Sequence, residues 1–282
     1  MPLHATSIAR MNALRQVEDW PAEHVAVAVV EPSGTIASYG DIERSFRFAS
    51  VTKLYAALAA LVALEEGVVD LEDPAGPPGS TLRHLLAHAS GLPFEDGPPI
   101  GRPGERRIYS NVGFEAAAAH IAAAAEMPFA DYARAAVFQP LGLGLELKGS
   151  PAGRDWALGG PIAEVAALGR ELLAPTLVAP ETLAEATTVQ FPGLVGVLPG
   201  FGRQEPNDWG LGIELRDAKS PHWTGSRNSP RTFGHFGASG TFLWVDPDAE
   251  LALACLTDLE FDGWAAEAWP RLADAVLAEA RG

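Results

Sequence analysis

Ser50-Val51-Thr52-Lys53 is the stretch of sequence from which the rest of the chain can be interpreted. It opens an apolar segment that extends to residue 66, and this composition predicts a buried helix. Side chains three residues apart share a helix face, so the amine of Lys53 would lie near the hydroxyl of Ser50. Such an amine can take the serine proton and activate the oxygen as a nucleophile. A helix-capping serine followed by a solvated lysine is the alternative.

Strand signals flank this segment on both sides along the chain. Residues 24–30 are rich in β-branched side chains, Pro32-Ser33-Gly34 is a turn signal, and residues 35–39 would form the partner strand. Four more strand signals follow Trp209, at residues 212–215, 232–236, 241–245 and 250–256. Asp246-Pro247-Asp248 predicts the hairpin turn between the last two. We therefore expect an α/β (α+β) fold whose antiparallel sheet is built from both chain ends.

Helical patterns precede, interrupt and follow these strands. A first helix is predicted by three-residue apolar spacing at Ile8, Met11, Leu14 and Val17. Further helices are expected over residues 112–126, 128–138 and 263–280. The sequence thus predicts an α/β sheet domain formed by residues 1–67 and 206–282, with a mainly helical domain, residues 68–205, inserted into it.

The composition restricts the partners and the compartment. The chain has 282 residues and a formal net charge of -16, which disfavours nucleic acid and anionic membrane surfaces as partners. The sequence has neither a secretory signal pattern nor an apolar stretch of about 18 residues, so we expect a cytoplasmic protein without a membrane span. The single cysteine, Cys255, lies in an apolar run and is expected to be a buried thiol.

Two more motifs carry residues suited to acyl-transfer chemistry. Tyr109-Ser110-Asn111 lies at the end of a loop, where a phenol beside an ammonium group is expected to have a lowered pKa and to exchange protons. The glycine-rich segment 234–240 allows backbone N–H groups to approach a ligand, as an oxyanion hole requires. An ordinary core aromatic at Tyr109 and a structural strand histidine at His235 are the alternatives.

Together these segments resemble the serine β-lactamase and penicillin-binding-protein-like superfamily, and within it the class C-like branch that includes esterases and D-amino-acid peptidases. Ser50-Val51-Thr52-Lys53 matches the S-x-x-K motif, Tyr109-Ser110-Asn111 matches the Y-x-N motif, and His235-Phe236-Gly237 takes the place of the K-T-G motif. The matches follow the family's order over nearly the whole chain. The resemblance implies a β-lactamase/transpeptidase-like fold with the active site between the two domains.

The resemblance also implies a role for each motif residue. Ser50 would be the acylated nucleophile, and either Lys53 or Tyr109 would be the resting base, with Tyr109 passing a proton to the leaving group. The backbone N–H groups of Ser50 and Ala238 would form the oxyanion hole. Asn111 would bind the acyl side of the substrate. No metal and no organic cofactor is expected.

The third motif departs from the antibiotic-hydrolysing members of the family, whose Lys and Thr receive a substrate carboxylate. His235 is mostly neutral at pH 7 and Phe236 has no hydroxyl, so His235, Phe236 and Gly237 are expected to bind a substrate that lacks this carboxylate. Arg227 and Arg231, just upstream, could restore an anion contact. A carboxylesterase acting on a small ester or amide is the first expectation. A β-lactamase, a D-Ala-D-Ala-type carboxypeptidase or D-aminopeptidase, and a non-catalytic penicillin sensor or scaffold are the alternatives.

His84 and His88 are four residues apart in a segment expected to be helical, where they could in principle ligate zinc. The residues between them lack the glutamate that a metalloprotease helix needs. The family resemblance makes both histidines structural.

Overall fold

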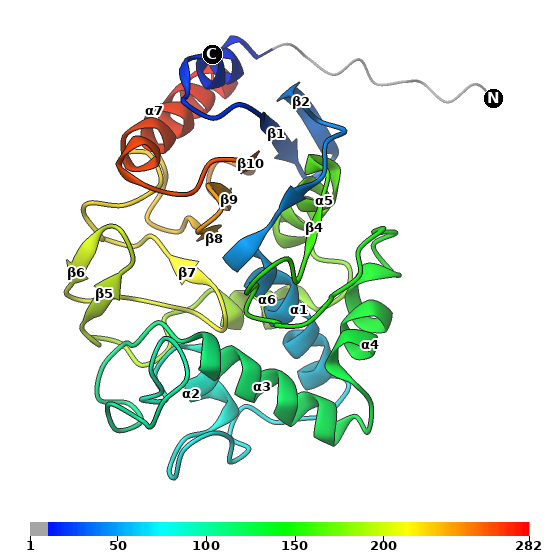
Figure 1. The fold of residues 1–282 in the computed structure, drawn as a ribbon, viewed down its shortest axis with the longest axis vertical. Coiled ribbons are helices and arrows are strands. Elements are labelled where there is room, and N and C mark those ends of the chain that lie inside the picture. The colour runs from blue at the N-terminus through cyan, green and yellow to red at the C-terminus, as the bar shows by residue number, and fades with distance from the viewer. Residues whose placement is uncertain (1–10, 282) are drawn as a thin grey trace.

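The computed structural model describes residues 11–281 and contains a six-stranded sheet with helices on both of its faces (Figure 1). Its strands are β1 (Val25–Glu31), β2 (Gly34–Gly40), β7 (Glu214–Leu215), β8 (Phe233–Gly237), β9 (Thr241–Asp246) and β10 (Leu251–Thr257). They lie in the order β2-β1-β10-β9-β8-β7, and every neighbouring pair is antiparallel. This confirms the predicted antiparallel sheet assembled from both chain ends.

The helices and short strands agree with the sequence in most places and differ in a few. The helices are η1 (Asn12–Asp19), η2 (Ala49–Val51), α1 (Thr52–Glu65), α2 (Leu82–Leu86), α3 (Asn111–Ala124), α4 (Phe129–Ala133), η3 (Arg134–Phe138), α5 (Ile162–Leu173), α6 (Pro180–Ala186) and α7 (Gly263–Ala280). Two small antiparallel pairs are formed by β3 (Phe46–Arg47) with the distant β4 (Gly159–Gly160), and by β5 (Gly196–Leu198) with β6 (Gly202–Gln204). The first predicted helix is a 3-10 helix, η1, and Ile8 of its pattern lies outside the described residues. The helix expected over residues 128–138 is divided into α4 and a π-helical segment, η3.

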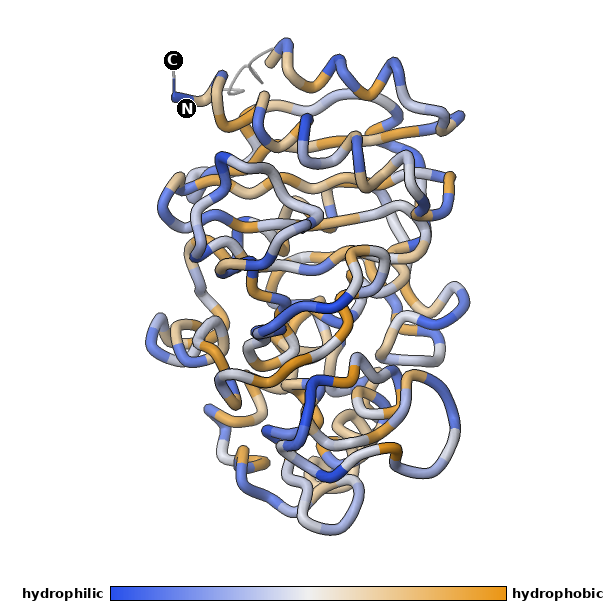
Figure 2. The backbone as a smooth tube through the Cα atoms, turned by 90° about the vertical axis from the view of Figure 1, so that its left-hand side faces the viewer, coloured by the Kyte–Doolittle hydropathy of each residue, from blue (hydrophilic) through white to orange (hydrophobic). Residues whose placement is uncertain are grey.

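Each face of the sheet is buried under a different set of helices. In β1, Val27 and Val29 belong to the cluster that includes α7 and η1, whereas Ala26 and Ala28 belong to the cluster that includes α5 and α1. Successive strand side chains point to opposite faces, so one apolar strand contributes to two cores. Figure 2 shows hydrophobic residues along the strands and hydrophilic residues gathered in the loops. This double burial explains why β1 and β10 are apolar up to their last residues, Glu31 and Thr257, rather than alternating with polar residues.

Helix α5 lies within the range predicted to form the helical domain, yet it packs on the sheet against β1, β9 and β10. A Cβ added at Gly169 of α5 would lie 3.2 Å from Leu243 and 3.3 Å from Ala252, so the helix and sheet approach closely. The division at residues 68 and 205 stays a prediction. Cys255 is buried in β10, as expected. None of the helices within residues 11–281 has the length and apolar character needed to cross a membrane.

Candidate active site

Ser50 lies in the short helical turn η2, immediately before α1, and the segment leading to it is held by hydroxyl groups near the start of β9. Thr241 Oγ1 donates a hydrogen bond to the carbonyl of Phe48 at 3.0 Å, and Ser239 Oγ donates to the carbonyl of Arg47 at 2.8 Å. Ala49 has a φ of 46°, a left-handed conformation that costs energy for a residue with a Cβ. The packing around Ser50 therefore maintains a strained backbone at the predicted nucleophile.

The loop around Gly153 contacts the same strained residue. Gly153 has a φ of 79°, and a Cβ at this position would lie 1.9 Å from the carbonyl oxygen of Ala49. The neighbouring carbonyl of Ala152 accepts a hydrogen bond from Lys53 Nζ at 2.7 Å. Glycine at position 153 thus allows this loop to contact both the segment before Ser50 and the predicted base.

We expect Gly153→Ala to reduce activity by about 10²-fold, because a displacement of about 1 Å at a reacting group has that effect. Overpacking of this kind also destabilises a protein by about 1–3 kcal/mol. Gly149→Ala is the matched control, since Gly149 also has a positive φ, 112°, but has open space where a Cβ would be. Urea unfolding and ester hydrolysis should separate the two variants. Equal effects in both would show that backbone strain alone, and not the contact with Ala49, is responsible.

The structure brings together three predicted catalytic side chains from two distant segments. Lys53 Nζ lies 3.1 Å from Ser50 Oγ, and Tyr109 OH lies 2.8 Å from the same oxygen. The Ser50 hydroxyl is therefore within hydrogen-bond reach of both an amine and a phenol, which is the geometry required of a nucleophile with its proton partners.

The other hydrogen-bond partners of Lys53 determine where its lone pair would point. Nζ also lies 2.8 Å from Asn111 Oδ1 and 2.7 Å from the carbonyl of Ala152, and both of these atoms can only accept. Asn111 Nδ2 donates to Glu95 Oε1 at 3.1 Å, which fixes the orientation of the amide. A neutral amine has two N–H bonds, and these two acceptors use both. Its lone pair is then left for the proton of Ser50.

Burial changes the pKa of both proton partners of Ser50. Burial lowers the pKa of Lys53 to about 7, although the carboxylates of Glu115 and Glu95 act in the opposite direction and Arg154 adds to the lowering. Burial raises the pKa of Tyr109, and this outweighs the lowering effect of its hydrogen bond to Ser50. The expectation of a lowered tyrosine pKa is therefore wrong, because desolvation of the phenolate exceeds any stabilisation by the ammonium group.

Ser50 opens into a cavity of about 150 Å³ with mainly apolar walls. Ala238, the second predicted oxyanion residue, lies on its wall, as do His235 and Phe236 of the third motif. Gly237 and Asn111 do not line it. A Cβ at Gly237 would lie 2.7 Å from the carbonyl oxygen of Phe48, so this glycine lets β8 approach the segment before Ser50.

His235 brings no charge to this cavity. Burial lowers the pKa of His235 to about 3, and the neighbouring Lys53 adds to that effect. The Nδ1 atom lies 2.7 Å from the carbonyl of Phe236, which can only accept, so the ring hydrogen is on Nδ1 and Nε2 has a lone pair. Nε2 has no hydrogen-bond partner among the described residues. The ring therefore has neither a charge nor, at the buried Nε2, a hydrogen to donate to a substrate carboxylate.

The two upstream arginines do not compensate for this missing cation. Arg231 forms an ion pair with Asp248 at 2.8 Å, and neither Arg231 nor Arg227 lines the cavity. Within residues 11–281, the cavity wall contains no lysine or arginine. Its ionised side chain is Glu214: burial opposes ionisation, but Lys219 and His222 outweigh it and lower the pKa of Glu214 to about 2. Lys219 pairs with this carboxylate inside the protein.

Several residues around the site were not identified from the sequence. Glu95, Glu115 and Arg154 surround Lys53 and Asn111, with Arg154 forming ion pairs to both glutamates. Trp209 and Phe94 contribute aromatic walls to the cavity. All of them except Glu115 lie in loops, and no local pattern in the sequence distinguishes them from ordinary surface or core residues.

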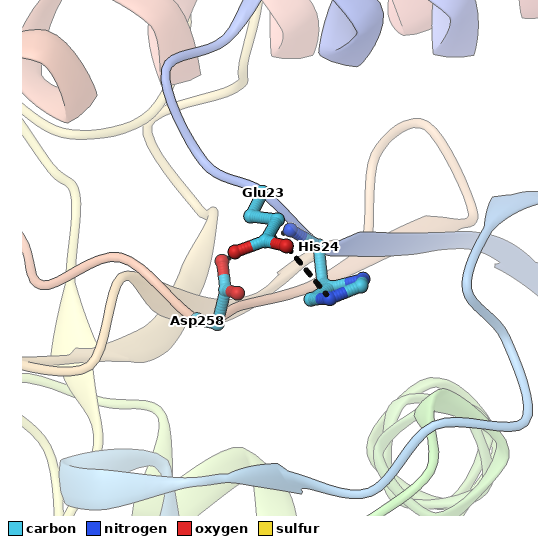
Figure 3. A group of neighbouring side chains, drawn as sticks. All are labelled: Glu23, His24 and Asp258. Carbon is cyan, nitrogen blue, oxygen red and sulfur yellow. Dashed lines mark hydrogen bonds and ion pairs between the residues drawn. The ribbon is translucent and has the colours of Figure 1, made fainter.

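A separate group of polar side chains is formed by Glu23, His24 and Asp258 at one end of the sheet (Figure 3). Their potential ligand atoms lie within 4.8 Å of one another. These side chains already serve local contacts: His24 Nδ1 lies 2.6 Å from Asp41, and the amide of His24 donates to Asp258. The group therefore has a structural explanation.

His84 and His88 do not share a helix face. Helix α2 ends at Leu86, and His88 has a φ of 54°, so the helix does not continue between them. His84 forms a capping box with Thr81 at the start of α2. His88 is buried, and its Nδ1 accepts a hydrogen bond from the amide of Ser110. Both histidines have the structural roles that the family resemblance implied.

Comparisons with known proteins agree with this fold over nearly the whole chain. A solved β-lactamase of Mycobacterium bovis is 52% identical, with a TM-score of 0.93, over 95% of this chain and 99% of that one. Unliganded simvastatin synthase of Aspergillus terreus is 18% identical, with a TM-score of 0.77, over 96% and 98% of the two chains, and shares the fold. Penicillin-binding protein 4* of Bacillus subtilis is 30% identical over 131 residues, which cover 35% of this chain and only 29% of that protein.

The Beta-lactamase family model matches residues 25–278 of this chain. The matched region contains all six strands of the sheet and the three motifs. The sheet order and the position of the S-x-x-K segment at the start of α1 are in accord with that match. The chain belongs to the β-lactamase family.

Proposed function

We propose that the protein is a serine carboxylesterase that hydrolyses small esters through an acyl-enzyme on Ser50. The observation that supports this best is the hydrogen-bonded series Tyr109 OH, Ser50 Oγ and Lys53 Nζ, in which the buried lysine has a pKa of about 7. About half of the Lys53 amines would be neutral at pH 7 and able to accept a proton. A pure binding protein would have no need of such a base.

In the proposed reaction, Lys53 takes the proton of Ser50 as Oγ attacks the ester carbonyl. The backbone N–H groups of Ser50 and Ala238 stabilise the tetrahedral oxyanion, each contributing about 3–4 kcal/mol to the transition state by analogy with other acyl-transfer enzymes. Tyr109 donates its proton to the leaving alkoxide and is reprotonated by Lys53. Water then hydrolyses the acyl-enzyme by the same route in reverse.

The cavity beside Ser50 supports a neutral acyl group. Its walls are mainly apolar, its His235 is uncharged, and no cation in the described part of the chain lines it. Moving a carboxylate into such a place without a charged or hydrogen-bonding partner costs several kcal/mol. These features favour esters over penicillins and cephalosporins, whose carboxylate lies close to the scissile amide.

β-Lactam hydrolysis is the second candidate, because the Mycobacterium bovis protein described as a β-lactamase is 52% identical. We expect kcat/KM for p-nitrophenyl butanoate to exceed that for a chromogenic cephalosporin by at least about 10²-fold, since the cavity offers the carboxylate no partner. Parallel assays with purified protein test this. A preference for the cephalosporin would overturn the esterase, and a long-lived penicilloyl adduct without turnover would favour a sensor.

A further inference from the structure

A second and larger cavity lies beside the catalytic one. Its volume is about 490 Å³, against about 150 Å³ for the cavity at Ser50. Phe94, Tyr109 and Pro199 line both cavities, and Tyr109 OH lies 2.8 Å from Ser50 Oγ. The two cavities therefore adjoin along these three residues, beside the reacting hydroxyl. We call the larger one the outer groove.

The outer groove has apolar walls that no other part of the described chain covers. Its two sides are the loop 94–108 and the hairpin formed by β5 and β6, which are joined by a hydrogen bond from the amide of Arg107 to the carbonyl of Val195 at 2.9 Å. Ile100 and Val197 lie on these sides and are 53% and 59% exposed. Large aliphatic side chains this exposed, on the wall of a concave site, are suited to an apolar segment of a ligand.

Two arginines give the outer groove a positive charge that the catalytic cavity lacks. Arg106 and Arg203 are exposed and line the groove, and none of its lining residues is acidic. Among residues 11–281, no carboxylate lies within ion-pair distance of Arg106, whose guanidinium donates to the carbonyl of Ile100 at 2.6 Å, and Arg203 pairs with Glu205 alone. That pair is largely exposed, so it holds Arg203 only weakly. Arg107 is not available to a ligand in the groove, because its guanidinium is buried and all three of its nitrogens donate to backbone carbonyls.

We propose that the outer groove binds the leaving group of esters in which an apolar spacer ends in an anion, a carboxylate or a phosphate, with Arg106 and Arg203 as the anion contacts. This inference rests on the proposed esterase function and names its substrate class. A guanidinium binds either anion through paired N–H groups. In a chain with a net charge of -16, a groove with two exposed arginines and no acidic wall is a local exception that favours such a group.

The leaving group is assigned to this groove because Tyr109 lines it, whereas Ser50 and Ala238, the proposed contacts of the acyl carbonyl, line only the smaller cavity. Tyr109 is the proposed proton donor to the departing alkoxide, so the alkoxide must leave on the side of the tyrosine. The acyl group would then occupy the smaller cavity with Ala238 and His235. The anion is thus expected at the far end of the alcohol and not next to the scissile carbonyl, which separates this substrate class from the β-lactams.

The test uses three butanoate esters of one six-carbon alcohol that ends in a carboxylate, a phosphate or a neutral amide. Butanoate release by the wild-type protein gives kcat/KM for each ester, and we expect the anionic esters to exceed the amide by about fivefold at low salt. This ratio should fall towards one in the double variant R106Q/R203Q and at high ionic strength. The double variant R134Q/R271Q removes the same charge from exposed helix positions and should keep the wild-type ratio. The larger of the two anionic ratios identifies carboxylate or phosphate as the preferred group.

Five outcomes would overturn the proposal. If the anionic esters and the amide ester have equal kcat/KM in the wild-type protein, the proposed anion contact is wrong, but the proposed esterase function is unaffected. A ratio that persists in R106Q/R203Q, or that is lost equally in R134Q/R271Q, would assign the effect to other charges. Dependence on Arg106 and Arg203 for an ester whose anion is on the acyl side would reverse the assignment of the two cavities. Absence of Ser50-dependent hydrolysis of all three esters would refute the proposed function itself.

Discussion

Ser50→Ala is expected to abolish ester hydrolysis, with kcat falling by roughly 10⁶-fold, the loss observed when the nucleophile of a serine hydrolase is removed. The Ser50 oxygen is the atom that both Lys53 and Tyr109 contact, so its removal leaves the base and the proton donor without a nucleophile. The fold should remain, because the side chain of Ser50 forms no other hydrogen bond within residues 11–281.

Intact-mass spectrometry after treatment with a fluorophosphonate measures this directly. The wild-type protein should gain the mass of one phosphonyl group, and Ser50→Ala should gain none. Ser33→Ala, at the exposed turn between β1 and β2, is the matched control and should be labelled like the wild type. Labelling of Ser50→Ala at the wild-type rate would mean that another residue is the nucleophile, and the proposed acyl-enzyme would then have to be abandoned.

Segments with strong local signals were predicted most closely by the sequence. The last helix, α7, has the bounds expected for it, and the side chain of Asp262 accepts a hydrogen bond from the amide of its first residue, Gly263. Strands β9 and β10 lie within one residue of their predicted ends, since both are apolar runs separated by a turn. The strand expected over residues 212–215 is only two residues long, because Gly212 has a φ of 73° that an extended strand does not allow.

Long-range packing was the part of the fold that local patterns could not provide. Helix α5 covers the sheet although it lies far from the strands along the chain, and its packing against β10 depends on Gly169 meeting Ala252. Neither partner is distinctive in sequence. A pattern of apolar residues predicts that a helix has a buried face but not which surface it covers.

The same distinction applies to the site. Ser50 and Lys53 are three residues apart, so helix geometry alone predicts their contact. Tyr109 was assigned through the family resemblance, because nothing local relates it to Ser50. The carbonyl of Ala152, which binds Lys53, is a backbone atom that any residue could supply, so the sequence gives no sign of it. The predicted direction of the Tyr109 pKa shift is wrong for a related reason. The burial that raises this pKa results from tertiary packing, which the local sequence does not show.

The pH dependence of kcat/KM should rise through a midpoint near pH 7 and then remain level. In the proposed mechanism the neutral form of Lys53 is the base, so activity should be lost as the pH falls below about 7 and this amine becomes protonated. Tyr109 has a raised pKa and stays protonated well into the alkaline range, so it should cause no descending limb below pH 10. Initial rates of neutral-ester hydrolysis in buffers of constant ionic strength measure this profile.

Two variants test whether Lys53 is the group whose titration gives the midpoint near pH 7 in kcat/KM. Lys53→Met removes the base and should lower kcat/KM by about 10²–10⁴-fold, with the limb near pH 7 lost. Glu115→Gln removes a negative charge that raises the pKa of Lys53, so the midpoint should move to lower pH. Glu43→Gln, at an exposed position outside both cavities, should leave the midpoint unchanged. If Tyr109 were the resting base instead, the limb would lie above pH 10 and would not respond to Glu115, because a phenol must lose its own proton before it can accept one from Ser50.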